Sequence, residues 1–181
     1  MTNLIDLSSR DDAGNLRVVI ETPKGSLAKI KYNPSFAAFE LQRFVSASGY
    51  PYDWGFVPST IAADGDPLDA MVIHDGHTWP GVVIPSLSIG LLKLVEAKAG
   101  ETNTRRNDRL IAVPVASLRA GAGIQLSPEI RLLLERFFVA TGELARKRVS
   151  IEGWASEGEL ADALARACEA YDAKRRPRAV G

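Results

Sequence analysis

The chain has 181 residues, 46% hydrophobic and 24% charged, which is typical of a globular protein with one substantial core. Its 22 basic and 22 acidic side chains cancel, which excludes a global field that would attract nucleic acid or a membrane surface. Cys168 is the only cysteine, which excludes an internal disulfide framework and a cysteine zinc site. No stretch has the pattern of a signal segment or of an apolar membrane span. We expect a cytoplasmic protein with one domain over 1–181, whose segments 1–16 and 174–181 are peripheral.

Short strands punctuated by Gly and Pro are predicted over most of the chain. A long apolar stretch, 82–96, is divided by Pro85 and Gly90. Strands do not alternate with helices, which favours a sandwich or a small closed barrel over a parallel sheet. The predicted strands cover 17–22, 27–32, 39–43, 70–73, pieces of 82–96, 109–113 and 148–151.

Two helices are predicted in the last third of the chain. The first begins at Ser127-Pro128, an N-cap residue followed by proline in the first turn. Its core-facing side is predicted to carry Ile130, Leu133, Leu134, Phe137 and Phe138. The second begins at Ser156, with Glu159 at capping-box spacing, and repeats apolar residues at Leu160, Leu164, Cys168 and Tyr171. The fold class expected is therefore mainly β with flanking helices.

The stretch "STIAADGDPLDAMVIHDG" places Asp64, Asp66 and Asp69 directly before a core strand. Asp64 and Asp66 are expected to point the same way, because alternate residues of an extended segment share a face. Two carboxylates about 4 Å apart repel by about 4 kcal/mol in a partly enclosed site, so an enclosed cluster needs a cation. A solvated acidic loop is the alternative, since Asp, Gly and Pro also build ordinary turns. The EF-hand spacing does not match, and Mg²⁺ fits better than Ca²⁺.

The motif "DGDPLD" followed by an apolar strand resembles the signature of the soluble family I inorganic pyrophosphatases. Other segments resemble this family in the same order: "VVIETPKGSLAK", "FELQRFV", "YPYDWGFVPST", "PGVVIPSLSIGLLKL" and "NDRLIAVP". The similarity runs from about residue 18 to about residue 154. It implies a closed five-stranded OB-like β-barrel with two main C-terminal helices.

The resemblance also implies the site residues. Metal ligation falls to Asp64, Asp66 and Asp69, and Asp66 also accepts a proton from the attacking water. Glu21 would support the metal network through water, and Glu96 stands where the family usually has aspartate. Substrate binding falls to Lys29, Arg43, Tyr50 and Arg109, the last in place of a family lysine.

Several positions depart from the family pattern. Lys31 replaces a glutamate and Trp54 replaces a tyrosine, while Asn107 replaces an aspartate. A shift of one residue would let Asp108 reach the metal instead. After Phe137-Phe138 the family has a tyrosine-lysine pair, whereas this chain has Thr141-Gly142. Lys31, or a basic residue of the pair 147–148, is the hypothesised source of the lost positive charge.

The favoured function is Mg²⁺-dependent hydrolysis of inorganic pyrophosphate, with Mn²⁺ as a possible substitute and a homo-oligomeric assembly as the family suggests. A hydrolase of another phosphoanhydride or phosphate ester remains an alternative, as does a non-catalytic relative. A single-stranded nucleic-acid module is disfavoured, because the aromatic segment 50–56 carries no interleaved Lys or Arg. We expect neither a nucleic-acid nor a membrane partner.

Overall fold

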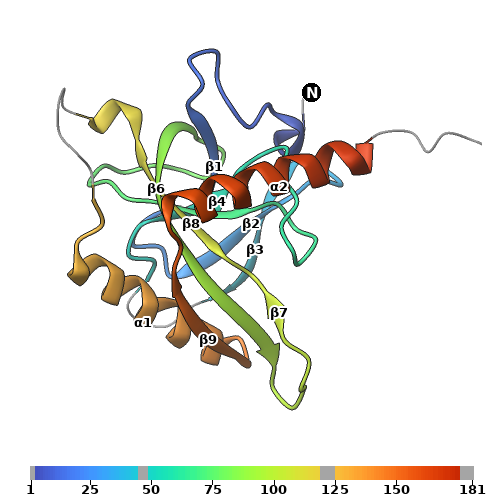
Figure 1. Cartoon of the computed structure of the whole chain (residues 1–181), viewed down its shortest axis with the longest axis vertical. Coiled ribbons are helices and arrows are strands. Elements are labelled where there is room, and N and C mark those ends of the chain that lie inside the picture. Colours follow the sequence, from blue (N-terminus) through green and yellow to red (C-terminus); the bar gives the residue numbers. More distant parts are fainter. Residues whose placement is uncertain (1–2, 45–48, 119–124, 176–181) are drawn as a thin grey trace, which may run out of the picture.

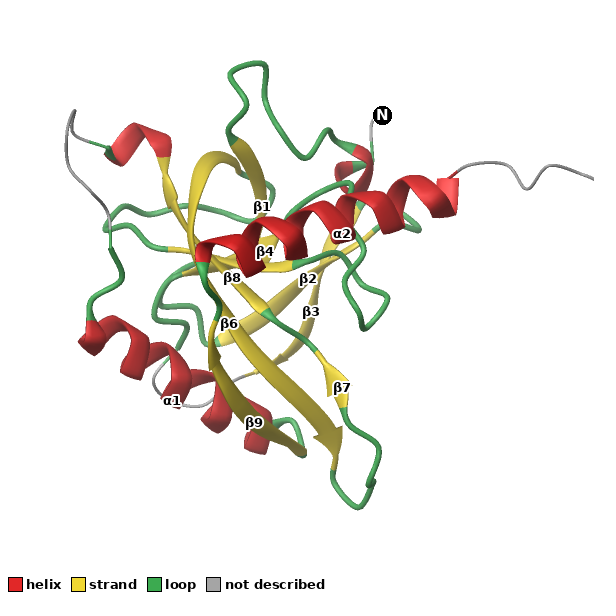
Figure 2. Ribbon diagram, viewed as in Figure 1, coloured by secondary structure: helices red, strands yellow, loops and turns green. Residues whose placement is uncertain are grey.

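A computed structural model describes residues 3–44, 49–118 and 125–175, and Figure 1 shows their arrangement. The described part is mainly sheet, with two α-helices that lie against it (Figure 2). The helices are α1 (Pro128–Leu144) and α2 (Glu157–Arg175), and the short 3₁₀ turns are η1 (Leu4–Asp6) and η2 (Val115–Ser117). The strands are β1 (Leu16–Thr22), β2 (Ala28–Asn33), β3 (Ala38–Phe44), β4 (Asp53–Phe56), β5 (Asp69–Val72), β6 (Val83–Lys98), β7 (Arg105–Arg106), β8 (Arg109–Pro114) and β9 (Lys147–Trp154).

Five strands close into a ring. β1 pairs with β4, β4 with β5, β5 with β8, β8 with β6, and β6 returns to β1. The pair β5–β8 is parallel and the other four pairs are antiparallel. Closure leaves no edge among these five strands. The expected mainly-β fold with an OB-like five-stranded ring and two helices is confirmed. The structure also contains β4, which the sequence analysis treated only as part of an aromatic segment.

The 16-residue strand β6 belongs both to the ring and to an arm outside it. Its first part pairs with β1 and β8 inside the ring, and its last part pairs with β9 in an arm that extends away from the ring (Figure 2). A bulge in β6 falls at Ile89, and a bulge in the partner strand β9 falls at Glu152, opposite Lys93 and Leu94. Such bulges bend a strand and increase its twist. One long strand can therefore close the ring and still carry the arm.

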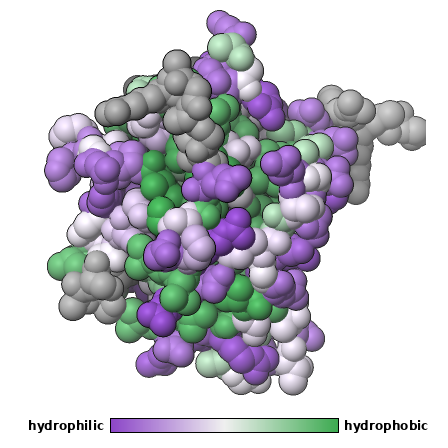
Figure 3. Space-filling view, turned by 60° about the vertical axis from the view of Figure 1, so that its left-hand side comes forward, coloured by the Kyte–Doolittle hydropathy of each residue, from purple (hydrophilic) through white to green (hydrophobic). Residues whose placement is uncertain are grey.

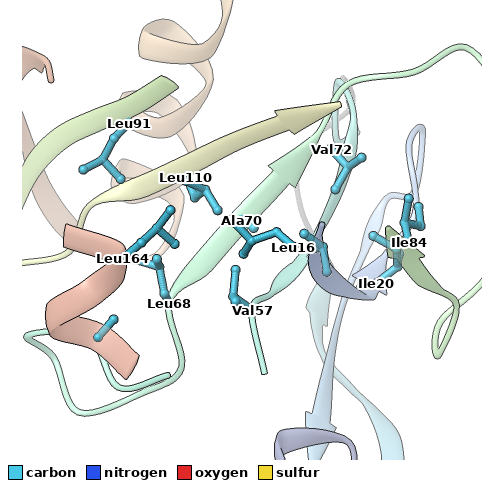
Figure 4. Packing of buried hydrophobic residues seen from close by; sticks show 12 residues of the cluster. Leu16, Ile20, Val57, Leu68, Ala70, Val72, Ile84, Leu91, Leu110 and Leu164 are labelled. Atoms are coloured by element: carbon cyan, nitrogen blue, oxygen red, sulfur yellow. The ribbon is translucent and has the colours of Figure 1, made fainter. Parts of the chain in front are cut away.

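Two apolar clusters hold the helices against the sheet. The first joins ring residues such as Leu16, Ala70 and Leu110 to Leu164 of α2 (Figure 4). The second places Leu134 and Phe138 of α1 against the other side of the sheet, with Trp54, Met71, Leu92 and Ile111. The caps formed by Ser127 and by Ser156 with Glu159 are present as predicted. Leu133 was assigned wrongly to the core face, since it is 45% exposed, and Cys168 is only partly buried.

The hairpin β2–β3 lies outside the ring and is attached by aromatic packing. Tyr32 of β2 lies 5.2 Å from Phe39 and 6.2 Å from Phe56 between ring centroids. These contacts form a third buried cluster together with Val19 of β1. The hairpin is thereby fixed beside β1, which matters for the basic side chains that it carries.

The surface mixes hydrophilic and hydrophobic side chains, as one face shows in Figure 3. Exposed large apolar residues include Leu132, Leu133 and Leu144 of α1 and Phe44 at the end of β3. Within the described ranges, no helix combines the length and apolar character that a membrane span requires.

Gly55 of β4 provides a test of ring closure. A Cβ at this position would lie 1.9 Å from the backbone oxygen of Val19, so the β1–β4 pair has no room for a side chain. We expect Gly55→Ala to reduce the free energy of unfolding by at least about 3 kcal/mol in urea denaturation. The matched change Gly158→Ala has open space within 4 Å and should cost nothing. Equal stability of the two variants would contradict this account.

Candidate active site

One pocket of about 350 Å³ contains all nine residues that the family resemblance assigns to metal or substrate binding. Its acidic members are Glu21, Asp64, Asp66, Asp69 and Glu96. Its basic members are Lys29, Lys31, Arg43, Arg109 and Lys147. Tyr50, Trp54, Asn107, Phe137, Phe138, Thr141 and Gly142 complete the wall with a few neighbours. The structure thus brings together residues that span 127 positions of the chain, from Glu21 to Lys147.

The basic side of the pocket comes from the hairpin β2–β3. Lys29 and Arg43 are directly opposite each other in its register, next to a bulge between Lys29 and Ile30. Lys31 lies two residues after Lys29 and therefore shares its face. Burial lowers the pKa of Lys29. The hairpin delivers three cations to one spot because strand alternation and register both direct them there.

The aspartate motif forms a tight turn, not the extended segment that we expected. Gly65 has φ +89°, and its N–H donates to the carbonyl of Ala62 at 2.9 Å. The backbone N–H of Asp66 donates to Oδ1 of Asp64 at 3.1 Å. Short Asp side chains stabilise turns in this way, and glycine tolerates the left-handed conformation. Asp64 and Asp66 still reach the pocket, while Asp69 enters it as the first residue of β5.

Four ion pairs neutralise three of the five acidic side chains. Lys31 Nζ lies 3.0 Å from Asp66 Oδ2, and Lys147 Nζ lies 2.6 Å from Glu96 Oε2. Arg109 pairs with Asp69, and its Nη2 lies 2.8 Å from Glu96 Oε1. Burial raises the pKa of Glu96, but the charge of Arg109 and the hydrogen bond from Lys147 outweigh it and lower this pKa overall. The cations of the chain thus offset much of the repulsion among the acids.

Arg109 lies against two neighbouring aromatic rings. Its guanidinium carbon lies 5.2 Å from the ring centroid of Trp54 and 5.7 Å from that of Phe138. Its side chain is only 7% exposed, and Nη1 also donates to the side-chain oxygen of Asn107. Guanidinium planes stack well on aromatic faces. Trp54, which stands where the family pattern has a tyrosine, lies in the pocket wall against this cation.

Asp108 lies outside the pocket, whereas Asn107 lines it. The carboxylate of Asp108 accepts the backbone N–H of Leu94 at 3.2 Å and Nε of Arg106 at 2.8 Å. Adjacent residues of an extended segment point to opposite sides, so both cannot face one site. The shift that would bring Asp108 towards the metal residues does not occur.

Burial raises the pKa values of three groups in the pocket. Burial raises the pKa of Glu21 to about 7, although its Oε1 accepts the backbone N–H of Tyr32 at 2.8 Å. Burial also raises the pKa of Tyr50 to about 12, which keeps its phenol protonated as a donor. Burial raises the pKa of Asp64 as well. An added cation would lower the free energy of the ionised carboxylates.

The donor set suits a hard divalent cation in part. Carboxylate and amide oxygens are the ligands that Mg²⁺ takes, usually one or two carboxylates with water and substrate phosphates. No group of three or more His, Cys, Asp or Glu among the described residues is close enough to form a complete cage. Glu21 and Asp64 form no ion pair with a described residue. The residues therefore fit an ion that shares its coordination with water and a phosphate ligand.

A small closed barrel with a mixed acidic and basic pocket is the class of protein that these observations define. The family model described as inorganic pyrophosphatase matches residues 18–172. The chain therefore belongs to the inorganic pyrophosphatase family, as the resemblance implied. Membership implies a divalent-metal requirement and pyrophosphate as the substrate of the family.

Individual relatives agree over nearly the whole chain. The inorganic pyrophosphatase of a Synechocystis species is 35% identical over 161 residues, which cover 84% of this chain and 89% of the relative. That of a Nostoc species is 33% identical over 93% of this chain and 99% of the relative. The crystal structure of the Thermus thermophilus inorganic pyrophosphatase superposes with a TM-score of 0.84 at 30% identity, covering 94% of this chain and 99% of that one.

The raised pKa of Glu21 predicts a pH dependence of stability. The folded pKa of about 7 lies above the ordinary value of 4.5, so the folded state binds more protons between these values. Stability therefore falls as pH rises through this window. In urea unfolding without divalent ions, we expect Glu21→Gln to recover up to about 3 kcal/mol at pH 8 and almost none at pH 4. The matched change Glu101→Gln, on an exposed residue after β6, should not reproduce this recovery. An identical pH profile for wild type and Glu21→Gln would contradict the assignment.

Proposed function

We propose that this chain hydrolyses inorganic pyrophosphate to two phosphate ions with Mg²⁺, for which Mn²⁺ can substitute. The observation that carries the proposal is the single pocket in which five carboxylates face five cationic side chains. Pyrophosphate is a dense polyanion, so its binding needs positive charge and its hydrolysis needs an activated water. Family membership supplies the reaction class, and the pocket supplies residues for each part of it.

Asp64, Asp66 and Asp69 are assigned as metal ligands, with Glu21 and Glu96 in supporting positions. When bound, a divalent ion lowers the pKa of a coordinated water and neutralises charge on the phosphates. Asp66 is the group assigned to take the proton of the attacking water. Lys31 holds one oxygen of this carboxylate, which leaves the other oxygen to accept the proton.

The basic residues bind and orient the substrate. Lys29 and Arg43, opposite each other on the hairpin, are placed to hold phosphate oxygens by charge-assisted hydrogen bonds. Tyr50 is 5% exposed and offers its protonated hydroxyl to the wall of the site. Arg109 is assigned to the opposite wall, where Asp69 and Glu96 fix its orientation. Pyrophosphate would thus be held between β3 on one side and β8 on the other.

Family membership is also the basis for the proposals about cellular location, partners and oligomeric state. A single domain in the cytoplasm is proposed, without nucleic-acid or membrane partners. A homo-oligomer is proposed as well. The exposed leucines of α1, Leu132, Leu133 and Leu144, offer apolar surface for contacts between copies.

Another phosphoanhydride or phosphate ester is the second candidate substrate, because the C-terminal end of α1 brings only small side chains to the pocket. Thr141, Gly142 and Ala145 line it, where the family has a tyrosine-lysine pair. A Cβ at Gly142 would lie 2.3 Å from Cγ2 of Val149, so a lysine cannot simply be restored there. This part of the pocket wall is where we expect a different substrate specificity to arise.

Phosphate release from purified protein tests the proposed function directly. We expect release from pyrophosphate with Mg²⁺ and none with a chelator. Asp66→Asn should lose activity by about 10²- to 10⁴-fold, because the amide cannot accept the proton. The control Asp108→Asn changes a neighbouring carboxylate outside the pocket and should stay near wild type.

The substrate panel decides between the candidates. Faster release from triphosphate or a nucleotide than from pyrophosphate would favour the second one. No release from any of these substrates, despite measured metal binding, would identify a non-catalytic relative and contradict both.

Lys31→Ala and Lys147→Ala test whether these residues replace the lost phosphate contacts. Each lysine lines the pocket, so we expect each change to raise the KM for pyrophosphate by about 3- to 10-fold through lost charge attraction. Lys98→Ala, at the exposed end of β6, is the matched control. Unchanged KM values for both pocket variants would contradict the compensation.

A further inference from the structure

We propose that Arg109 is a resident cation that takes the place of a divalent ion at the Asp69–Glu96 end of the pocket. Metal binding is then confined to the end formed by Asp64 and Asp66, which removes Asp69 and Glu96, the partners of Arg109, from the ligand set assigned above. Any role of Arg109 in turnover rests on the proposed function. The predicted pattern of metal binding does not, because metal binding is measured without substrate.

Arg109 cannot leave the pocket easily. The neighbouring rings of Trp54 and Phe138 lie against it, and the backbone of β8 anchors it between β5 and β6. Asp69, Asn107 and Glu96 all accept hydrogen bonds from its two terminal nitrogens. Its Nε is buried and has no hydrogen-bond partner among the described residues. The guanidinium carries a positive charge, so the chain itself supplies a cation to the site.

The two pocket lysines that form ion pairs differ from Arg109 in their exposure. The side chains of Lys31 and Lys147 are 42% and 41% exposed, against 7% for Arg109. A half-exposed ammonium on a flexible stem can turn into solvent when another cation arrives. Arg109 lacks this freedom because aromatic rings and carboxylates surround it. Asp66 is therefore open to a metal ion in a way that Glu96 is not.

The carboxylate oxygens support this division. Oε1 of Glu96 contacts Arg109 and Oε2 contacts Lys147, so both oxygens are engaged. Asp69 gives Oδ2 to Arg109. An ion at Glu96 would have to approach a fixed positive charge that touches the same carboxylate, which is unfavourable by Coulomb's law. At the other end, Asp64 pairs with no described cation and lies beside Asp66.

Trp54 acts as a positioning residue for Arg109. The indole gives Arg109 a broad π surface, whereas the tyrosine expected from the family would add a hydroxyl. Asn107 likewise accepts a hydrogen bond from Arg109 without adding the negative charge that aspartate would bring. Both departures from the family pattern suit an arginine at this position.

Mn²⁺ titration without substrate tests the proposal, with bound ions counted by isothermal calorimetry and by electron paramagnetic resonance of free Mn²⁺. We expect Arg109→Gln to bind about one more ion per chain than wild type, or to bind its weakest ion about tenfold more tightly. The matched control Lys147→Gln removes the same charge from the same carboxylate, Glu96. Lys147→Gln should leave the number of bound ions unchanged and should change the affinity for the weakest ion by no more than about twofold. The reason is that Lys147 can already turn away from Glu96 into solvent.

The same count and affinity in wild type and Arg109→Gln would overturn the proposal. An equal gain in Lys147→Gln would overturn it too, since any loss of charge would then suffice. Loss of pyrophosphate hydrolysis without a change in these numbers would support the assignment of Arg109 to substrate binding and would still overturn the resident-cation proposal.

A crystal of the wild-type protein soaked in Mn²⁺ keeps the proposal testable if Arg109→Gln does not fold. Anomalous scattering should place Mn²⁺ on Asp64 or Asp66, with Arg109 still against Trp54 and Phe138. A Mn²⁺ ion coordinated directly by Glu96, with Arg109 displaced, would refute the inference.

Discussion

The enclosure of five carboxylates in one pocket is the constraint on which the arrangement of this site depends. Two such groups about 4 Å apart repel by about 4 kcal/mol at the effective dielectric of a partly buried site. The chain answers with five cations from four strands, β2, β3, β8 and β9, which face acids on β1, β5, β6 and the aspartate turn. Each ion pair therefore also ties together two elements that are distant in sequence. Lys147 and Glu96, for example, join β9 to the arm of β6 at its outer end.

The barrel supplies the rigidity that this charge pattern requires. Apolar clusters fill the sheet on both faces, so the polar groups can gather only where the strands leave the ring. Bulges occur in β1 at Glu21 and in β3 at Gln42, beside the Lys29–Arg43 pair. A bulge changes which way the following side chains point. The irregularities of the sheet thus lie next to residues of the pocket, where a regular ladder would have directed them elsewhere.

The sequence predicted this site better than it predicted the geometry within it. The aspartate motif, the alternation of Lys29 and Lys31, and the two helix caps are local signals, and the structure contains all of them. The turn at Gly65 was missed because an Asp–Gly–Asp stretch is compatible with either conformation until its hydrogen bonds are known. The packing of Trp54 against Arg109 and Phe138 was not predicted, because these partners are distant from Trp54 in the sequence. Helical periodicity alone likewise could not tell that Leu133 lies beyond the buried stripe of α1.

The departures from the family pattern make physical sense when they are taken together. Lysine for glutamate at position 31 and asparagine for aspartate at position 107 remove negative charge from the pocket, while glycine for lysine at position 142 removes one positive charge. The result is a lining with equal numbers of acidic and basic side chains. A balanced lining attracts fewer metal ions than an acidic one, and it repels a polyanionic substrate less before any metal is bound. Charge that relatives with an acidic lining would take from solution is in this chain supplied partly by side chains. Among these, Arg109 is the one that packing holds in place.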